Sequence, residues 1–361
     1  MSERHAGALR VGIDAIAGFA DRIDVRSPAE FALDHVPGAV SHPVLDDEQR
    51  ARIGTLYAAS PFDARRLGAA LVARNIASML DRAFADKPRD WRPLVYCWRG
   101  GQRSRALAHV LNEIGWRAMQ LDGGYRAYRR EVTAQLRVVP ARLDFVVVGG
   151  LTGSGKSRLI VALDAARAQA LDLEKLAAHR GSLLGDLPDA PQPSQKAFES
   201  ALLERLQRFD PSRPVFVEAE SRRVGTLQLP DALLERMRAG RGIALATAQP
   251  LRVALLKEDY PHFLADADAL GQRLQRLVAL HGKTTLAHWT ELASAGEWDA
   301  LIGELLSRHY DPAYARSHSA HYAPAQPTHR VDVDDVSPRG FAALAQRLAV
   351  RFAPRNAVAA H

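Results

Sequence analysis

Two kinds of hydrophobic pattern alternate along the first two thirds of the chain. Short runs of β-branched and large apolar residues at 93–96 and 145–148 are bounded by turn residues, which is typical of buried strands. The stretch 62–84 instead spaces its apolar residues for one face of a helix, at Leu67, Leu71, Ile76 and Leu80. Strands that alternate with helices predict an α/β fold.

Weaker patterns extend this picture. Strands are predicted at 22–26, after the turn 35–38, at 170–173 and at 215–217, and a helix is predicted from Ser104 to Ile114, ending at Gly115. After about Arg241 the chain is predicted to be mainly helical, and the last eight residues are expected to fray. A boundary near 138–141 divides the 361 residues into two domains, each long enough to bury its own core.

The composition is that of a soluble globular protein, with 47% hydrophobic and 25% charged residues and a mean hydropathy of −0.18. No apolar run approaches the roughly 18 residues of a membrane span, and no signal-peptide core is present, so a cytoplasmic protein without a membrane partner is predicted. The net charge of +7 suggests a polyanionic partner. Only six of the 48 basic residues are lysines, and this arginine excess could equally reflect base composition.

Cys97 is the only cysteine, so any atom that it carries must be passed to an acceptor outside the chain. It stands between a predicted strand and a predicted helix, in the loop Cys97, Trp98, Arg99, Gly100, Gly101, Gln102, Arg103 and Ser104. Backbone amides, the helix N-terminus and arginine charge would favour a reactive thiolate and cradle a persulfide or perselenide. The alternative, a buried structural cysteine, is disfavoured by two glycines and two arginines within six residues.

The spacing from Cys97 to Arg103 is that of cysteine-dependent phosphatases, C-x5-R. Many sulfurtransferase loops are one residue shorter, and the longer loop leaves room for a tetrahedral anion. A phosphatase and an enzyme that uses a phosphate-bearing donor such as selenophosphate are both compatible with this spacing. Tyr96 stands where such phosphatases tend to have histidine.

A second anion site is predicted where G-x-x-x-x-G-K-[ST] follows the strand at 145–148 and precedes a helix. Its diphosphate-binding residues are Gly150, Thr152, Gly153, Ser154, Gly155, Lys156 and Ser157. Glycines let the backbone approach a diphosphate, Lys156 neutralises it, and the Ser157 hydroxyl could bind Mg²⁺. The motif predicts diphosphate binding and leaves ATP hydrolysis open. Glu218 and Glu220, after the strand 215–217, could hold a metal or orient substrate, or belong to a surface charge cluster.

Several segments together resemble a rhodanese domain. They are Asp24-Val25-Arg26, His35-Val36-Pro37-Gly38-Ala39-Val40, the Cys97 loop and Leu121-Asp122-Gly123-Gly124-Tyr125. The fold implied is a rhodanese-like α/β domain at 1–138, followed at 139–361 by a P-loop NTPase-like α/β domain with a mainly helical C-terminal part.

This pairing of domains resembles the bacterial tRNA 2-selenouridine synthase family. Further support comes from 60–62, 171–174, 179–182, 191–196 and 218–223. The resemblance runs from about Asp14 to at least Gly225 and is weak in the C-terminal helices. It implies that wobble 2-thiouridine of tRNA is geranylated from geranyl diphosphate and then converted to 2-selenouridine with selenophosphate, with no tightly bound cofactor.

On this resemblance Cys97 carries selenium as a perselenide, Gly100, Gly101 and Arg103 stabilise the anion, and the P-loop binds the diphosphate. Expected partners are tRNA, the small donors and the selenophosphate-producing enzyme. Arg126, Arg129 and Arg130 are candidates for tRNA phosphate contacts, or else form a solvated helix face. Two alternatives stay open: a cysteine-dependent sulfurtransferase or phosphatase fused to an ATP-binding kinase-like domain, and a regulatory anion-binding protein.

Overall fold

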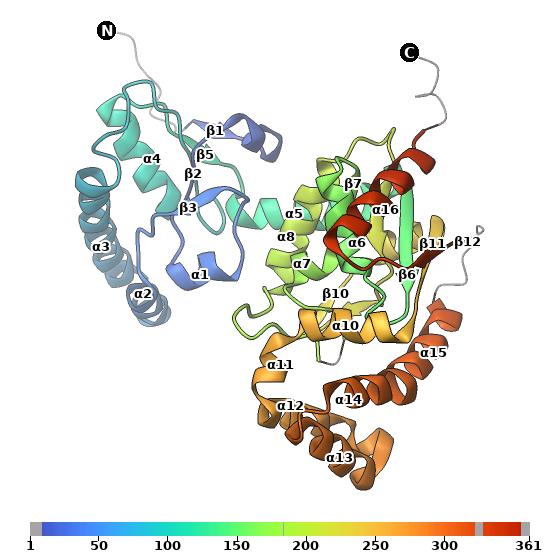
Figure 1. Ribbon diagram of the computed structural model, residues 1–361. Helices are drawn as coiled ribbons and strands as arrows, with labels where there is room; N and C mark the ends of the chain where they lie inside the picture. Colours follow the sequence, from blue (N-terminus) through green and yellow to red (C-terminus); the bar gives the residue numbers. More distant parts are fainter. Residues whose placement is uncertain (1–8, 183, 322–327, 355–361) are drawn as a thin grey trace. The chain divides into compact units, whose positions relative to one another are not determined.

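The structure is a computed structural model that describes residues 9–182, 184–321 and 328–354 (Figure 1). It separates into two compact units, one of residues 9–135 with 193–204 and the other of residues 136–192 with those from Arg205 onward. Each unit has its own five-stranded sheet. The boundary between residues 138 and 139 stays a prediction. Of the last eight residues, expected to fray, all but Pro354 lie outside the described residues.

The sheet of the first unit is parallel throughout, in the order β1-β5-β4-β2-β3. Its strands are β1 (Arg10–Val11), β2 (Arg22–Asp24), β3 (Ala39–Ser41), β4 (Leu94–Tyr96) and β5 (Met119–Leu121). The helices are α1 (Pro28–Leu33), α2 (Asp47–Ala59), α3 (Pro61–Arg82), α4 (Gln102–Ile114) and α5 (Gly124–Val138), with a 3₁₀ helix at Ile13–Gly18. Strand, turn and crossover helix recur, which is why the strands are parallel.

The core of this unit forms where α3 and α4 pack on the sheet. Ile76 of α3 and Leu107 of α4 are buried together with Ile23 and Val95 of the strands. The predicted helix 62–84 and strands 22–26 and 93–96 are confirmed. So is the end of α4, where Gly115 adopts a left-handed φ of 108°.

The second unit has a parallel sheet in the order β12-β11-β6-β8-β7. Its strands are β6 (Phe145–Gly150), β7 (Gln169–Leu171), β8 (Val215–Glu218), β11 (Arg241–Thr247) and β12 (Thr328–Val333), and β9 (Arg223–Val224) and β10 (Leu227–Gln228) form a hairpin. The helices are α6 (Lys156–Ala165), α7 (Leu173–Ala177), α9 (Asp231–Arg238), α10 (Gln249–Asp259) and α16 (Pro338–Arg351), with a 3₁₀ helix at Pro140–Arg142. Helix α8 (Gln195–Gln207) precedes β8 in the chain, and its residues up to Glu204 belong to the first unit. Helices α6 and α16 lie side by side and bury Phe341 and Leu344 against Val146 and Val148 (Figure 1).

A helical group is inserted between β11 and β12, and Figure 1 shows it projecting beyond α10. It comprises α11 (Pro261–Ala265), α12 (Ala267–Leu274), a 3₁₀ turn (Gln275–Leu277), α13 (Val278–Ser294), α14 (Trp298–Leu305), a π-helical turn (Leu306–Tyr310) and α15 (Asp311–His321). Trp289 is fully buried in a separate core here. The mainly helical C-terminal part is confirmed, but strands β11 and β12 within it were missed. β12 is an edge strand, whose alternating polar residues give a weak hydrophobic signal.

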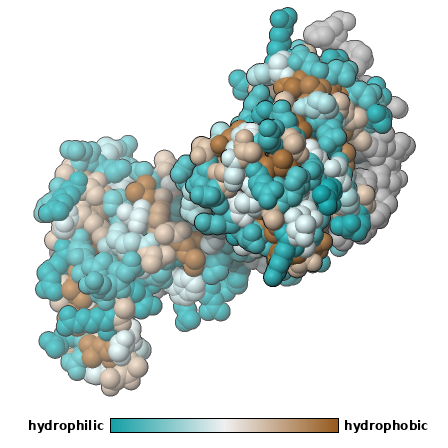
Figure 2. Space-filling view, turned by 60° about the horizontal axis from the view of Figure 1, so that its bottom comes forward, coloured by the Kyte–Doolittle hydropathy of each residue, from teal (hydrophilic) through white to brown (hydrophobic). Residues whose placement is uncertain are grey.

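Hydrophilic residues cover most of the face drawn in Figure 2, and hydrophobic residues are exposed there in small, separate patches. Within the described ranges, no helix combines the length and the apolar character that crossing a membrane requires.

A cysteine cradle and a phosphate loop as candidate functional sites

Cys97 directly follows β4, and its side chain is buried. Its Sγ accepts hydrogen bonds from the backbone N–H of Gly101, at 3.2 Å, and from the Ser104 hydroxyl, at 3.1 Å. Gly101 is the N-cap of α4, so the sulfur also lies at the positive end of the helix dipole. Two donors and a helix N-terminus therefore converge on the sulfur, and its predicted reactivity as a thiolate stays a prediction.

Gln120 of β5 holds the cradle in shape. Its buried side-chain amide donates to the carbonyl oxygens of Gly100 and Gly101, at 2.8 and 3.1 Å, and to Ser104 Oγ, at 2.8 Å. Because Ser104 Oγ accepts this bond, its own proton is directed to Cys97 Sγ. Gln120 was missed by the sequence analysis; the available signal was a polar residue inside an apolar strand.

Arg103 makes an ion pair with Glu30 of α1, with 2.8 Å between its Nη1 and Glu30 Oε2. Burial tends to raise the pKa of Glu30, but Arg103 and the Ser27 amide outweigh it and leave this pKa below its usual value. The guanidinium therefore ties α1 to the cradle, and its expected role toward an anion on Cys97 stays a prediction. Of the other predicted loop residues, Arg99 and Gln102 are exposed, and Trp98 packs on Tyr125 with ring centroids 5.4 Å apart.

The turn at Gly123 and Gly124 forms the wall on the other side of the loop. Tyr125 N–H donates to the Cys97 carbonyl at 2.9 Å, and Gly124 has a φ of +57°. A Cβ on Gly124 would lie 2.3 Å from the Cys97 carbonyl oxygen and 2.5 Å from the backbone nitrogen of Gly100. Only glycine fits this approach of two backbone segments.

Gly124→Ala is therefore expected to lower the free energy of unfolding of the first unit by at least about 2 kcal/mol, because it combines left-handed strain with a backbone collision. Gly101→Ala is the matched control, since a Cβ there meets nothing within 4 Å and φ is −95°. Urea unfolding followed by tryptophan fluorescence measures both. Equal stability of the two variants would contradict this account of the turn.

A buried network lies behind the cradle. Arg26 and Asp24 form an ion pair that is almost fully buried, and the Arg26 guanidinium lies 3.8 Å from the Tyr125 ring centroid. The Tyr125 hydroxyl donates to Asp34 at 2.7 Å. Arg129 belongs to this network through ion pairs with Asp34 and Glu199, and its side chain is only 13% exposed. Its predicted contact with tRNA phosphate therefore competes with internal partners, whereas Arg126 and Arg130 are exposed.

The phosphate loop lies between β6 and α6, as predicted. Gly150, Gly153 and Gly155 all have positive φ angles, of 152°, 76° and 88°. A Cβ on Gly155 would lie 2.3 Å from the Phe341 ring of α16. The loop glycines thus serve both the backbone conformation and close packing against the neighbouring helices.

Lys156 bends back over the loop, and its Nζ donates to the carbonyl oxygens of Gly150 at 2.9 Å and Leu151 at 3.3 Å. Burial lowers the pKa of Lys156, and the carboxylates of Glu220 and Glu174 offset this only in part. Ser154 Oγ is buried and has no hydrogen-bond partner among the described residues. Phosphate oxygens placed here would accept hydrogen bonds from both groups, and their negative charge would favour the protonated amine.

Arg252 anchors the loop from α10. It donates to the Thr152 carbonyl at 2.8 Å and makes a bidentate pair with Asp311, at 2.6 and 3.0 Å. The Tyr314 hydroxyl accepts from the Gly150 amide at 3.0 Å. None of these supporting residues was identified from the sequence, because each lies about 100 or more residues from the loop.

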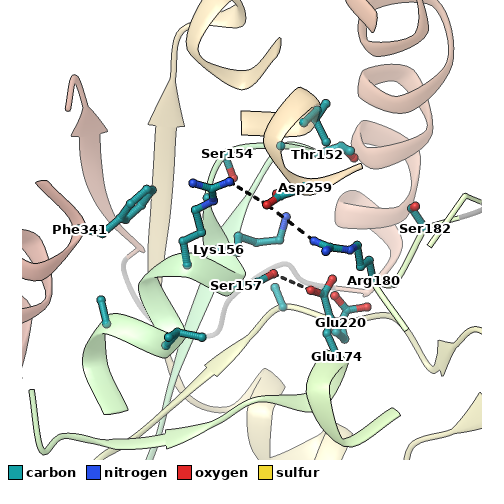
Figure 3. Close-up of a pocket in the computed structure, with 18 of the residues that line it drawn as sticks. Thr152, Ser154, Lys156, Ser157, Glu174, Arg180, Ser182, Glu220, Asp259 and Phe341 are labelled. Carbon is teal, nitrogen blue, oxygen red and sulfur yellow. Dashed lines mark hydrogen bonds and ion pairs between the residues drawn. The ribbon is translucent and has the colours of Figure 1, made fainter. Parts of the chain in front are cut away.

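Carboxylates gather beside the loop (Figure 3). Ser157 Oγ donates to Glu174 at 2.5 Å, and Glu218 Oε1 accepts from the Glu174 amide at 2.8 Å. Glu220 lines the same cavity as Glu174 and lies beside it. Glu218 Oε2 is buried without a partner in the described part of the chain. The structure brings the predicted Glu218 and Glu220 to this site and adds Glu174, which follows the neighbouring strand β7.

These carboxylates hold protons unusually tightly. Burial, reinforced by Asp172, raises the pKa of Glu218 well above its usual value. Burial and Glu174 raise the pKa of Glu220 to about 8, although Lys156 opposes this. Both effects favour the protonated form of Glu220.

Glu220 should make the protein less stable as the pH rises. Its pKa in the folded state is about 8, above the 4.5 of a free glutamate, so between these values only the unfolded state has lost the proton. The free energy of unfolding therefore falls across this window. Glu220→Gln is expected to be more stable than the wild type at pH 8 by roughly 1–3 kcal/mol, with a smaller gain at pH 6.

Thermal unfolding at both pH values measures this difference, with the exposed Glu235→Gln as a control that should follow the wild type. If Glu220→Gln also followed the wild type at both pH values, Glu220 would not be the titrating group.

The phosphate loop opens into a cavity of about 940 Å³. Its polar end holds Lys156, Ser157, Arg180 and Glu220, and Figure 3 places Phe341 on the side away from Arg180. Apolar lining residues are Val161, Ala162, Leu256, Ala313, Phe341 and Ala342. A narrower cavity of about 70 Å³ shares Thr152, Ser182, Leu256, Tyr260 and Tyr310 with the first and is otherwise almost wholly apolar, with Leu184, Phe263, Leu270, Leu301 and Leu305.

Comparisons with known proteins cover both sites. Residues 14–131 match the rhodanese-like domain, and residues 143–269 match the tRNA 2-selenouridine synthase AAA domain. The chain is 36% identical to tRNA 2-selenouridine synthase of Cupriavidus pinatubonensis, over 81% of this chain and 87% of that protein. Similar proteins of the same name occur in Nitrosomonas europaea, at 36% identity over 69% and 67% of the two chains, and in Bdellovibrio bacteriovorus, at 31% over 82% and 88%.

Proposed function

The chain belongs to the tRNA 2-selenouridine synthase family, and we propose that it replaces the sulfur of wobble 2-thiouridine in tRNA by selenium in two steps. A geranyl group from geranyl diphosphate first alkylates the 2-thio sulfur, and selenium from selenophosphate then replaces the geranylated sulfur. The observation that carries this proposal is the pairing of a cysteine cradle with a phosphate loop whose cavity has apolar walls.

The cavity beside the phosphate loop suits an isoprenoid diphosphate. Lys156, Ser157 and the loop amides form the end that would bind the diphosphate. The surface beyond it is lined mainly by aliphatic and aromatic side chains, such as Val161, Leu256 and Phe341. A ten-carbon chain would be desolvated on these walls, and each buried CH₂ group contributes about 0.8 kcal/mol.

In the alkylation step the 2-thio sulfur attacks C1 of the geranyl chain and the C1–oxygen bond breaks. The electron pair leaves with the diphosphate, and the uridine loses its N3 proton to solvent. Lys156 would exchange its loop carbonyl partners for phosphate oxygens and so stabilise the charge of the leaving group. The same end of the cavity would therefore bind the donor and promote its reaction.

The donors present also fit a magnesium ion. Ser157 Oγ and Glu174 supply hard oxygen ligands next to the diphosphate position, and Mg²⁺ usually binds one or two carboxylates together with substrate phosphates. Bound there, the ion would neutralise diphosphate charge. It would also favour ionised Glu174 and Glu220, whose pKa values are raised in its absence.

Electron balance limits how Cys97 handles selenium. A perselenide on Sγ holds selenium two electrons more oxidised than selenophosphate does, so loading it requires an added oxidant of the disulfide class. Attack of the thiolate on phosphorus instead breaks the P–Se bond, leaves phosphocysteine and releases hydrogen selenide without a redox change. The selenide can then add to C2 of the geranylated base and expel geranylthiolate, while water hydrolyses phosphocysteine to phosphate.

Mass spectrometry of the intact protein, quenched soon after mixing with selenophosphate in the absence of tRNA, distinguishes the two adducts, because selenium has a characteristic isotope pattern and phosphorus has one isotope. In both routes the Gly101 amide and the Ser104 hydroxyl stabilise the anionic sulfur.

The function is tested by incubating the protein with 2-thiouridine-containing tRNA, geranyl diphosphate and selenophosphate, and analysing the nucleosides by mass spectrometry. We expect geranylated 2-thiouridine without selenophosphate and 2-selenouridine with it. Absence of both products would refute the proposal. Phosphate release from unrelated phosphoesters, or ATP-dependent phosphorylation, would instead support the phosphatase or kinase-like alternative.

A further inference from the structure

A large groove in the first unit, with a volume of about 1460 Å³, lies along α2, α3 and α4. It begins at the cysteine cradle, since Gln102 and Arg103 belong to both. It continues along α4 through Ala106 and His109 to Arg117, past the end of the helix. The 13 residues of α4 span about 20 Å, so the groove leads from the reactive sulfur over a distance comparable with several nucleotides.

The lining of this groove is strongly basic. Its arginines are Arg50, Arg65, Arg103, Arg105 and Arg117, whereas Glu113 is the only acidic residue in the described lining. Arg105 and Arg117 are exposed, and in the part of the chain that the structure describes neither makes an ion pair with a carboxylate. Their charge is therefore available to an anionic partner, unlike that of Arg129, which is neutralised internally.

Aromatic side chains lie among these arginines. Tyr57 of α2 is 49% exposed, and the Arg65 guanidinium is 5.9 Å from its ring centroid and 3.4 Å from its hydroxyl. Trp116 lines the groove near Arg117. Arginine forks bind phosphates and exposed aromatic rings stack on bases, so the combination fits single-stranded or loop RNA better than an acidic protein surface.

We infer that this groove binds the tRNA, with its phosphodiester backbone on Arg105 and Arg117 and an unstacked base on Tyr57. The inference rests on the proposed function, because a wobble uridine must reach the Cys97 cradle. Nucleotides flanking it would then follow α4 away from the cradle. Neither Arg105 nor Arg117 touches Cys97, so both act in binding alone.

The test compares the double variant Arg105→Glu/Arg117→Glu with Arg74→Glu. Arg74 is an exposed arginine of α3 that does not line the groove. The affinity for tRNA that carries 2-thiouridine, before geranylation or selenium transfer, is measured by fluorescence anisotropy over a series of salt concentrations. We expect the double variant to bind at least about tenfold more weakly at 0.1 M salt, and the slope of log K against log salt to fall by about 1–2. Arg74→Glu should stay within about twofold of the wild type.

Tyr57→Ala gives a second, independent readout. Loss of a stacking platform should weaken binding about five- to tenfold without changing the salt slope. A wild-type urea unfolding curve, followed by tryptophan fluorescence, shows that the first unit of each variant is folded. If the double variant bound tRNA with the wild-type affinity and the wild-type salt slope, the inference would be overturned. Binding of an acidic protein to the groove would not rescue it. A wild-type protein that binds tRNA through these residues but forms no modified uridine would instead refute the proposed function alone.

Discussion

Cys97→Ala is expected to reduce selenium incorporation into tRNA by about a thousandfold or more, and to leave geranylation within about twofold of the wild type. The sulfur is the only thiol in the chain and the atom on which the cradle donors converge. The variant therefore lacks the nucleophile altogether, and the chain has no second cysteine that could replace it. The measurement is the yield of 2-selenouridine and of geranylated 2-thiouridine after the same reaction time.

Ser104→Ala provides a graded control for this variant. It keeps Cys97 but removes one of the two donors to its Sγ, so selenium incorporation should fall by roughly tenfold, the equivalent of one charge-assisted hydrogen bond. A parallel loss of geranylation and selenium incorporation in Cys97→Ala would contradict separate roles for the two sites.

Local sequence was sufficient to predict the parts of each site that are contiguous. The strand, glycine loop and helix around Cys97 are encoded in one short segment, and so are those around Lys156, because backbone conformation there is set by neighbouring glycines and apolar runs. Gln120, Glu30 and Arg252 could not be predicted from local sequence. Each is placed by packing of a distant element, and a lone polar residue in a strand or helix does not reveal its partner.

Local sequence also does not show which arginines are paired inside the protein and which are free to bind a partner. Arg103 and Arg105 are two residues apart on α4, yet the first is largely buried against Glu30 and the second is exposed in the basic groove. A helix turns by about 100° per residue, so these side chains leave it on different faces. Composition predicted a polyanionic partner, and only the fold separates structural arginines from those available to bind it.

Lys156→Ala is expected to weaken geranyl diphosphate binding at least about tenfold and to lower geranylation by about 100-fold or more, because the amine interacts with a diphosphate whose charge increases as the C1–oxygen bond breaks. Calorimetry measures the affinity, and nucleoside analysis the rate. Lys156→Arg keeps a positive charge, but its fork cannot reproduce the two short contacts of Nζ with Gly150 and Leu151. Lys156→Arg should therefore restore the affinity for geranyl diphosphate more fully than the rate of geranylation.

Supplying tRNA that is already geranylated removes the need for the phosphate loop. Lys156→Ala should then incorporate selenium at nearly the wild-type rate, whereas Cys97→Ala should stay inactive on the same substrate. Because Cys97 belongs to the first unit and Lys156 to the second, this cross-over assigns each chemical step to one anion site. Failure of Lys156→Ala on geranylated tRNA would mean that the phosphate loop also takes part in selenium transfer.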